Sequence, residues 1–306
     1  MAVEDFRSVG ARVRNWGRWG DDDERGTLNF VTPDKLVAAA ALVKQGKVFD
    51  LGIPLGSDGP QPGGGRINPV HLMSQTGDTQ VFPGGFQYAD DYIFMPLQGA
   101  SQWDALAHVY YDGQLYNGFP SSDVTVIGAA HCSIDKISTG VVGRGVLLDI
   151  ARLKGVDWMA AGTVITPADL EAAEAAQGVR LGSGDILVLR TGWRRFFLER
   201  RSPIEFMAGE PGLGQDCCEW LHTREVAAVC SDNWAIEVLP GESTEARLQV
   251  HMILIRDMGM TLGEILDLEA LAADCASDGV YEFMFCAPPL KVTKGVGSPI
   301  NPLAMK

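Results

Sequence analysis

The feature that most constrains the fold of this chain is a series of short apolar runs, several of them flanked by glycine or aspartate. They occupy residues 49–54, 92–97, 124–128, 146–150, 186–191, 226–231 and 281–286. Several runs are apolar at successive positions, which is typical of strands covered on both faces by other layers. Because the runs outnumber the helix signals and do not alternate regularly with them, the pattern predicts a mixed α/β fold rich in strands.

Two segments carry the residue types that begin a helix. Residues 32–34, Thr-Pro-Asp, offer a capping hydroxyl, a proline suited to the first helical position and a carboxylate in the first turn. We therefore expect a helix that runs through Lys44 and stops at Gly46. Residues 166–169, Thr-Pro-Ala-Asp, repeat the pattern and predict a second helix that ends near Gly178.

Size and charge bound the class of protein. A chain of 306 residues with 46% hydrophobic content can bury a large core, and no boundary between domains stands out. We expect one domain spanning residues 1–306, with residues 1–31 as an irregular N-terminal arm laid over its body. The net charge of −14 argues against binding to nucleic acid or to an anionic membrane surface.

The cysteines and the apolar runs bear on the compartment. The six cysteines lack zinc-finger spacing, and the adjacent pair Cys217 and Cys218 is unsuited to an ordinary structural disulfide. Free thiols are typical of a reducing compartment. Since no uninterrupted apolar run is long enough to span a bilayer, we predict a cytoplasmic location.

Residues 98–108 hold the densest group of chemically useful side chains. Gln98, Gln102, Asp104 and His108 lie within eleven positions, separated by small or apolar residues. A carboxylate beside a histidine and two amide oxygens suits a divalent cation and its water. The alternative is a helix start with Ser101 as N-cap and Asp104 at the third helical position. The spacing alone leaves both interpretations open.

A second polar pair lies in apolar surroundings near the end of the chain. His251 falls within the apolar run 248–255, and Glu264 falls within the run 260–266. A buried histidine is costly unless its ring nitrogens find partners, and most such residues are hydrogen-bonded core residues. A shared cation would satisfy both His251 and Glu264, and Asp104 would complete the set if the chain folds back on itself.

Other chemistries have weaker support. The remaining histidines, His71, His131 and His222, are expected to have structural or surface roles. No Gly-x-Ser-x-Gly motif accompanies a histidine, which disfavours a serine hydrolase. Neither a Gly-x-Gly-x-x-Gly turn after a strand nor a phosphate-binding P-loop is present, so the usual nucleotide signatures are missing.

Residues 98–108 resemble the signature His-x-Gly-Thr-His-x-Asp-x-Pro-x-His of the cyclase family of metal-dependent hydrolases, which includes kynurenine formamidase and isatin hydrolase. Asp104 and His108 match this signature, whereas Gln98 and Gln102 replace its two metal-binding histidines and Leu106 replaces its proline. The glutamine variant resembles the branch that contains trans-dienelactone hydrolase. Further similar blocks lie at residues 18–21, 26–29, 142–149, 184–193, 231–233 and 264–268, so the resemblance covers most of the chain.

The resemblance implies a fold and a set of site residues. The fold is a layered β/β/α arrangement, similar to a swivelling domain, with mixed sheets. One metal would be bound by Gln98, Gln102 and Asp104, and a second by Asp104, His251 and Glu264. The metal in such proteins is usually zinc or manganese. Because a glutamine oxygen is a weaker zinc ligand than imidazole but suits harder ions such as Mn²⁺, we expect the second set to be the stronger one.

The function expected from the resemblance is hydrolysis of a small cyclic ester, a lactone similar to a trans-dienelactone, by metal-activated water. His108 would carry the proton, a task suited to a pKa near neutrality, and Gln98 or Gln102 would donate an N–H group to the oxyanion. One alternative is an amidohydrolase acting on an arylformamide or a cyclic amide. Another is a non-catalytic binding protein on the same fold. The partners expected are a small-molecule substrate, a divalent Mn²⁺ or Zn²⁺ ion, and further copies of the chain in a homodimer or homotetramer.

Overall fold

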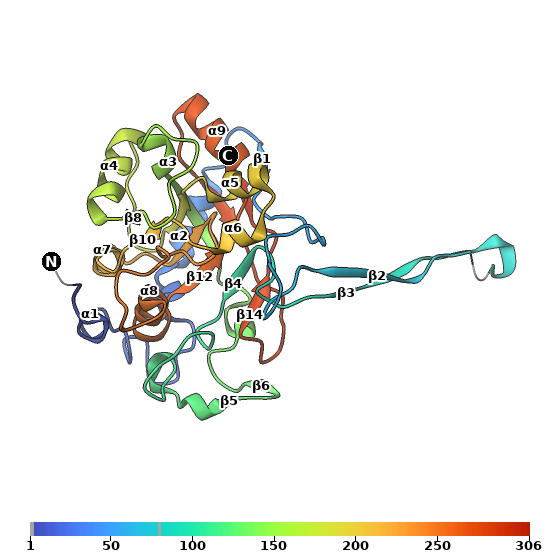
Figure 1. The fold of residues 1–306 in the computed structure, drawn as a ribbon, viewed down its shortest axis with the longest axis horizontal. Coiled ribbons are helices and arrows are strands. Elements are labelled where there is room, and N and C mark those ends of the chain that lie inside the picture. Colours follow the sequence, from blue (N-terminus) through green and yellow to red (C-terminus); the bar gives the residue numbers. More distant parts are fainter. Residues whose placement is uncertain (1–2, 79–80) are drawn as a thin grey trace.

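The computed structural model describes residues 3–78 and 81–306. Within these residues nine strands form one curled mixed sheet (Figure 1). In spatial order they are β1 (Val48–Asp50), β15 (Leu303–Met305), β13 (Glu282–Cys286), β7 (Val142–Asp149), β9 (Ile186–Arg190), β11 (Ala228–Ser231), β12 (Thr261–Glu264), β4 (Gln102–Asp104) and β14 (Gly297–Pro299). The mixed α/β fold predicted from the apolar runs is confirmed.

The centre of the sheet is parallel and its margins are antiparallel. Strands β7, β9, β11 and β12 run parallel to one another. All residues of β9 and β11 are buried, as expected for strands covered on both faces. Strand β12 then pairs antiparallel with β4, which places Glu264 opposite Gln102. This pairing brings residues 98–108 beside the C-terminal third of the chain.

The predicted helices form, one with a shorter span than expected. Helix α4 (Pro167–Gln177) begins with a complete capping box between Thr166 and Asp169 and ends at Gly178 in the left-handed conformation. Helix α2 (Pro33–Ala40) stops before Lys44. The reason is tertiary, because the backbone N–H groups of Gln45 and Lys47 donate to the carbonyl oxygen of Lys306 rather than continuing the helix.

The other helices cover the sheet or link its strands (Figure 1). They are α1 (Phe6–Arg12), α3 (Ile150–Leu153), α5 (Trp193–Arg200), α6 (Pro203–Met207), α7 (Cys217–Thr223), α8 (Gln249–His251), the π-helix η6 (Met252–Met258) and α9 (Glu269–Asp278). A two-stranded unit pairs β8 (Val164–Ile165) with β10 (Gly212–Leu213). Among the described residues, no helix is both long enough and apolar enough to cross a membrane.

Two antiparallel hairpins stand apart from the main sheet. The predicted strand 124–128 is instead a tight hairpin of β5 (Val124–Thr125) and β6 (Gly128–Ala129). Strands β2 (Val70–Gln75) and β3 (Asp90–Phe94) pair to form a long arm that projects from the body (Figure 1). Of the two strands of this arm, β3 overlaps a strand predicted from the apolar runs and β2 does not.

The segment near the N-terminus packs on the π-helix η6. The Arg14 guanidinium lies 2.9 Å from an Asp257 carboxylate oxygen. The Asn15 amide donates to the Met258 carbonyl at 2.9 Å, and the Trp16 indole N–H donates to the Arg256 carbonyl at 2.8 Å. These contacts hold the segment over the helix that follows His251. The six cysteines, all within the described part of the chain, are free thiols, and five of them are buried.

Candidate metal centre

Strand β4 presents its polar residues on one face and an aromatic residue on the other. Gln102 and Asp104 are two positions apart, so their side chains point the same way, whereas Trp103 points the opposite way. The buried Trp103 indole donates to the Ala287 carbonyl at 2.7 Å. It also lies so close to Gly263 that a Cβ atom there would be 2.6 Å from the indole ring. This close approach fixes the register of β4 against β12.

The capping-box interpretation of Ser101 and Asp104 is wrong. Residues 102–104 are a strand, and Ser101 links segments that are distant in sequence. The Ser101 hydroxyl donates to the Ile265 carbonyl at 2.6 Å and accepts the backbone N–H of Ile53 at 2.9 Å. Pairing with β12 therefore prevailed over a local helix start.

Three of the sequence-predicted ligands converge, and we call them the metal triad: Asp104, His251 and Glu264. One ligand atom from each lies within 4.8 Å of the others, and all three residues are buried. The His251 Nε2 atom is 3.1 Å from Glu264 Oε1 and 3.9 Å from Asp104 Oδ2. The residues come from β4, α8 and β12, so the triad forms only when the sheet does.

The electrostatics of the triad call for a positive charge. Burial, together with the neighbouring Glu264 carboxylate, raises the pKa of Asp104 well above its usual range. Burial alone would lower the pKa of His251, but hydrogen bonds to Glu237 and Glu264 raise it well above the ordinary value. Within the described chain, the buried Asp104 Oδ1 and Gln102 Oε1 atoms have no hydrogen-bond partner. Unpartnered oxygen atoms beside two buried carboxylates fit a divalent cation.

Glu237 orients the histidine of the triad. Its Oε1 atom is 2.6 Å from His251 Nδ1 and accepts the His251 backbone N–H at 2.9 Å. Its Oε2 atom accepts the backbone N–H of Val250 at 3.1 Å. A carboxylate at Nδ1 keeps that nitrogen protonated and turns Nε2 toward Asp104 and Glu264. Sequence reasoning missed Glu237, although it is a lone carboxylate in the apolar stretch 235–239, the signal that identified Glu264.

The two glutamines separate into different environments. The Gln102 Nε2 group donates to Glu264 Oε2, which directs the unpartnered Oε1 atom elsewhere. Gln98 instead contacts His108, with its Nε2 atom 3.4 Å from His108 Nδ1. The predicted first site of Gln98, Gln102 and Asp104 is therefore less favoured than the triad, because the Gln98 amide is engaged with the histidine.

His108 lies beside the triad with a strongly lowered pKa. Its Nε2 atom is 3.7 Å from Asp104 Oδ1 and 3.4 Å from the Arg66 guanidinium. Burial, the Arg66 charge and His251 lower the pKa of His108 to about 3. This direction departs from the pKa near neutrality expected from the sequence and favours the neutral form of the ring. An imidazole with a lowered pKa releases readily any proton that it takes up, which suits a group that transfers a proton.

Arg66 is the second site residue that sequence reasoning missed. It follows the glycine-rich loop 59–65, donates to the Gln98 carbonyl at 3.5 Å and lies 5.1 Å from the centre of the Trp234 ring. This contact geometry is that of a cation–π pair. No periodic pattern surrounds Arg66 in the sequence, so only the fold reveals that this cation lies beside His108.

The other histidines lie outside the triad. His71 is exposed on β2 and pairs with Asp91 at 2.7 Å. His131 pairs with Asp123 at 2.6 Å and stacks on Phe119. His222 lies in the last turn of α7, and burial lowers its pKa.

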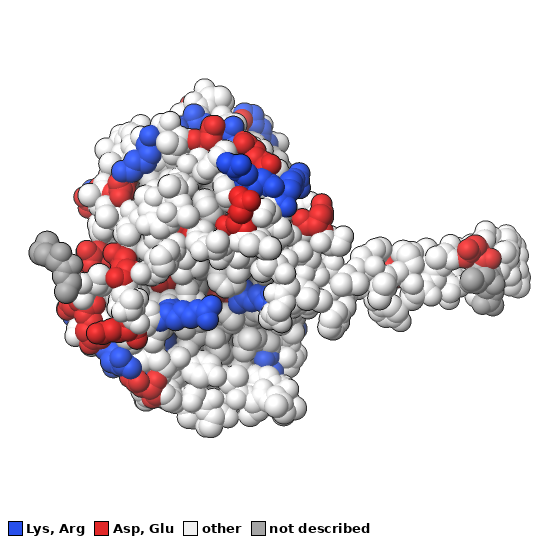
Figure 2. Space-filling view, in the orientation of Figure 1, with Lys and Arg blue, Asp and Glu red and all other residues white. Residues whose placement is uncertain are grey.

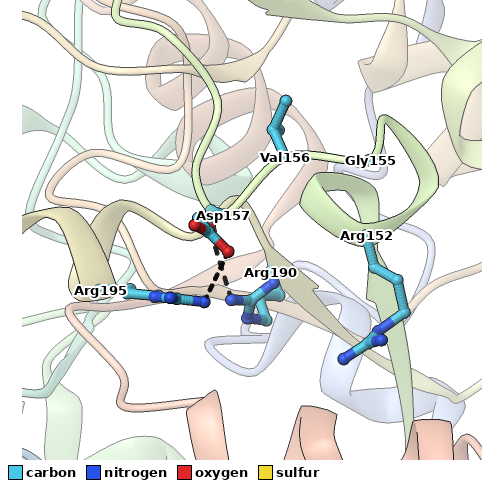
Figure 3. A pocket seen from close by; sticks show the side chains of 6 residues that line it. All are labelled: Arg152, Gly155, Val156, Asp157, Arg190 and Arg195. Carbon is cyan, nitrogen blue, oxygen red and sulfur yellow. Dashed lines mark hydrogen bonds and ion pairs between the residues drawn. The ribbon is translucent and has the colours of Figure 1, made fainter.

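A separate cavity of about 280 Å³ is rich in arginine (Figure 3). It is lined by Arg152, Gly155, Val156, Asp157, Arg190 and Arg195. Each guanidinium has a carboxylate partner: Arg190 lies 2.9 Å from Asp149, Arg152 lies 3.3 Å from the same residue, and Arg195 lies 2.8 Å from Asp157. Because each of these guanidinium groups is already paired with a carboxylate, the cavity is a poorer candidate for substrate binding than the surroundings of the triad.

Comparison with known proteins places the chain in a family. The Cyclase family model matches residues 49–238, a span that contains β4, His108 and Glu237. This chain belongs to the cyclase family. The family resemblance drawn from residues 98–108 is thereby confirmed, while the likeness to the trans-dienelactone hydrolase branch stays a prediction.

Individual relatives of this cyclase-family chain include a hydrolase and two solved structures. Isatin hydrolase from Roseibium aggregatum is 28% identical over 141 residues, which are 45% of this chain and 51% of the relative. The chain thus spans about half the length of this curated relative. A crystal structure of a cyclase is 44% identical, with a TM-score of 0.89 over 96% of this chain and 100% of the other. An isatin hydrolase bound to the product analogue thioisatinate has the same fold at 19% identity, with a TM-score of 0.64 over 88% of this chain and 95% of the other.

Proposed function

We propose that this chain is a metal-dependent hydrolase that opens a small cyclic amide. The observation that carries the proposal is the buried triad, where Asp104 Oδ1 and Gln102 Oε1 lack hydrogen-bond partners among the described residues. The amide substrate class is supported by the isatin hydrolase relative. The relatives thus favour the amidohydrolase alternative over the lactone hydrolysis expected from the glutamine pattern.

The residues that would hold the metal are Asp104, His251 and Glu264, with Gln102 Oε1 as a further donor. Two carboxylates, one imidazole and one amide oxygen suit Mn²⁺ and also accept Zn²⁺. A divalent cation bound there would polarise the substrate carbonyl and lower the pKa of water. Glu237 would keep the His251 ring in the orientation and tautomer that expose Nε2.

His108 would move the proton. The neutral ring accepts a proton from water as the water oxygen bonds to the carbonyl carbon, and returns it to the nitrogen as the C–N bond breaks. The product is a ring-opened amino carboxylate. Arg66 and the Gln98 amide lie 3.4 Å from the two ring nitrogens, and the Arg66 charge would favour the carboxylate that forms. In this scheme Gln102 assists as a metal donor rather than as the oxyanion donor.

We also infer the coarser organisation from the same observations. The layered β/β/α arrangement and the single domain of residues 1–306 are supported by the similarity to a cyclase structure across 96% of the chain. A cytoplasmic location is supported by the six free thiols.

The test measures metal content and amide hydrolysis on the same preparations. Wild-type protein loaded with Mn²⁺ or Zn²⁺ should open isatin, and an arylformamide and a dienelactone should be assayed beside it. Asp104→Ala should lose metal and activity together. His108→Ala should keep its metal and lose about 100-fold or more in kcat, the usual contribution of a general acid–base group.

Each outcome decides between the alternatives. Full metal loading of Asp104→Ala would overturn the ligand assignment. Hydrolysis of the dienelactone without hydrolysis of either amide would restore the lactone prediction. A protein with neither stoichiometric metal nor metal-dependent turnover would support the non-catalytic binding protein.

A further inference from the structure

Arg66 is a half-buried cation beside the metal triad, and its polar contacts include no acidic group. Within the described part of the chain these contacts are the Gln98 carbonyl at 3.5 Å and His108 Nε2 at 3.4 Å, neither of which is negatively charged. The arginines that line the cavity of Figure 3 are instead each paired with a carboxylate. Because a partly buried charge without a counter-charge is costly, an anionic ligand would stabilise Arg66.

The loop that carries Arg66 is tied to the segment leading into β4. An isolated bridge joins Gly63 to Arg66. The Asn68 side chain accepts the Gln61 backbone N–H at 2.9 Å and donates to the Gln61 carbonyl at 3.1 Å. The buried Gln61 side chain in turn donates to the Gly99 carbonyl at 3.2 Å. Arg66 is therefore held in place before a ligand binds, which lowers the entropic cost of binding.

Trp234 supports the guanidinium from one face. The Arg66 guanidinium carbon lies over the Trp234 ring, 5.1 Å from its centre. The buried Glu210 carboxylate fixes this tryptophan, because it accepts the backbone N–H groups of Trp234 and Ala235, both at 2.7 Å. A contact with the face of a guanidinium leaves the N–H groups in its plane for hydrogen bonds. The Trp234 indole N–H is also buried, and it has no hydrogen-bond partner among the described residues. Donors without acceptors thus gather at this wall of the site.

Trp234 and the triad share the edge of the sheet at which ligands bind in folds with parallel strands. Trp234 follows β11 and Glu264 ends β12, so both lie at the carboxyl ends of parallel strands. Arg66 precedes β2 in the chain. Figure 2 shows basic side chains on the body beside the base of the arm that β2 and β3 form, with mostly uncharged surface around them. This part of the molecule therefore suits an anion, although the whole chain has a net charge of −14.

Geometry and charge define the ligand as a carboxylate close to the reacting bond. The planar guanidinium binds a carboxylate through two parallel hydrogen bonds. One cation balances one negative charge, whereas the triad carboxylates nearby would repel a dianion such as a phosphate ester. Since Arg66 contacts His108, which would move the proton, an anion bound to Arg66 lies near the scissile amide. We propose that the substrate is a cyclic amide with a carboxylate substituent, which Arg66 binds. This inference rests on the proposed function and names its substrate class.

The test compares isatin with two of its carboxylates, on the full chain loaded with Mn²⁺. One carries the acid group ortho to the ring nitrogen, close to the scissile C–N bond, and the other carries it para, on the far side of the ring. Wild type should prefer the ortho acid to isatin by about 10-fold or more in kcat/KM, a factor typical of hydrogen bonds between charged groups. The difference should lie mainly in KM, because the substituent is bound alike in the ground state and the transition state. The para acid should show little preference.

Variants identify Arg66 as the source of the preference. The preference is the ratio of kcat/KM for the ortho acid to that for isatin, so any effect of a substitution on His108 that both substrates share cancels. Arg66→Met should abolish the preference. Arg66→Lys should retain part of it, since an ammonium group keeps the charge but not the planar geometry. The matched control is Arg25→Met, which should leave the ratio unchanged. Arg25 is also half-buried, but it lies beside Gly140, before β7 and at the opposite edge of the sheet.

The outcomes separate this inference from the proposed function. Equal kcat/KM for isatin and the ortho acid in wild type, or a preference that persists in Arg66→Met, would overturn the inference and leave the proposed function in place. Equal preference for the ortho and para acids would refute direct binding, because it would show a charge acting only at a distance. If wild type hydrolyses none of the three compounds, the proposed function fails, and calorimetric titration then tests Arg66 by itself. The ortho acid should bind wild type more tightly than isatin and lose this advantage in Arg66→Met, and equal binding or no binding would overturn the inference.

Discussion

At the scale of single residues, the metal triad depends on a side chain that would not touch the metal. Glu237 holds His251 by the ring Nδ1 atom and by the backbone N–H of the same residue. A carboxylate with two such contacts fixes both the rotamer and the tautomer of the ring. The His251 side chain therefore loses its conformational entropy when the protein folds, and metal binding does not have to order it again.

The substitution Glu237→Gln tests this positioning role. We expect the affinity for Mn²⁺ or Zn²⁺ to fall by about 10-fold to 100-fold, the usual effect of losing a residue that orients a metal ligand. Competition with a chelating dye measures the Kd. The control is Glu245→Gln, an exposed residue of the same region, which should bind metal like wild type. Equal affinities in both variants would remove Glu237 from the site.

The sequence could indicate the triad because Asp104 lies in the dense polar group 98–108, while His251 and Glu264 lie in apolar runs. His251 and Glu264 stood out in this way, and the structure brings both to Asp104. Arg66 could not be found, because its place beside His108 depends on how a glycine-rich loop folds over the sheet. The low pKa of His108 was equally hidden, since it arises from burial and from that same Arg66 charge.

At the scale of elements, the local sequence signals predicted the structure correctly where the backbone groups find their hydrogen-bond partners within the same element. The Thr166 capping box begins α4 as predicted, and Gly178 ends it. The end of α2 was wrong because Gln45 and Lys47 donate to a distant carbonyl, that of Lys306. Residues 101–104 were ambiguous for the same reason, since pairing with β12 decides their conformation.

Lys306 also fastens β15 to helix α9 through its side chain. The buried ammonium group lies 2.9 Å from Asp274 and 2.8 Å from Asp278. Hydrogen bonds from Lys47 and Lys306 lower the pKa of Asp274. Burial acts in the opposite direction on Asp278, but hydrogen bonds from Gln45 and Lys306 lower its pKa as well.

We expect Lys306→Met to reduce the free energy of unfolding at pH 7 by about 1–2 kcal/mol, since both carboxylates reach solvent and are partly screened. A lowered carboxyl pKa stabilises the fold above the ordinary value of 3.8, and this contribution is lost as the pH falls below it. The difference between wild type and variant should therefore shrink between pH 5 and about pH 2. Urea unfolding at several pH values measures it, with the exposed Lys291→Met as control. A difference that stays constant with pH would contradict the ion-pair explanation.

At the scale of the whole molecule, the triad joins segments that are distant in the chain. Asp104 lies on β4, His251 on α8 and Glu264 on β12. Without a cation, two buried carboxyl groups face each other across this junction, and burial together with the Glu264 charge raises the pKa of Asp104. Metal binding should therefore stabilise the entire fold rather than one loop.

Removal of metal with a chelator should lower the melting temperature. A cation at about 100 times its Kd stabilises the folded state by about 2.7 kcal/mol, which corresponds to roughly 5 °C for a chain of this size. Differential scanning calorimetry before and after chelation, and after addition of Mn²⁺, measures the shift. Asp104→Asn should show no response to either treatment. An unchanged melting temperature in wild type would mean that no cation bridges these segments.

The alternation of side chains along β4 has an evolutionary consequence. Trp103 locks the strand to Gly263 and Ala287 on one side, while Gln102 and Asp104 project from the other. One face of β4 thus carries the side chain that packs the strand in place, and the opposite face carries the candidate metal ligands. Ligands on the side of the triad can be exchanged, as glutamine for histidine, without disturbing the contacts of Trp103 on the opposite face. Substitutions at a few ligand positions can therefore change the metal site, and with it the reaction catalysed, while the fold stays the same.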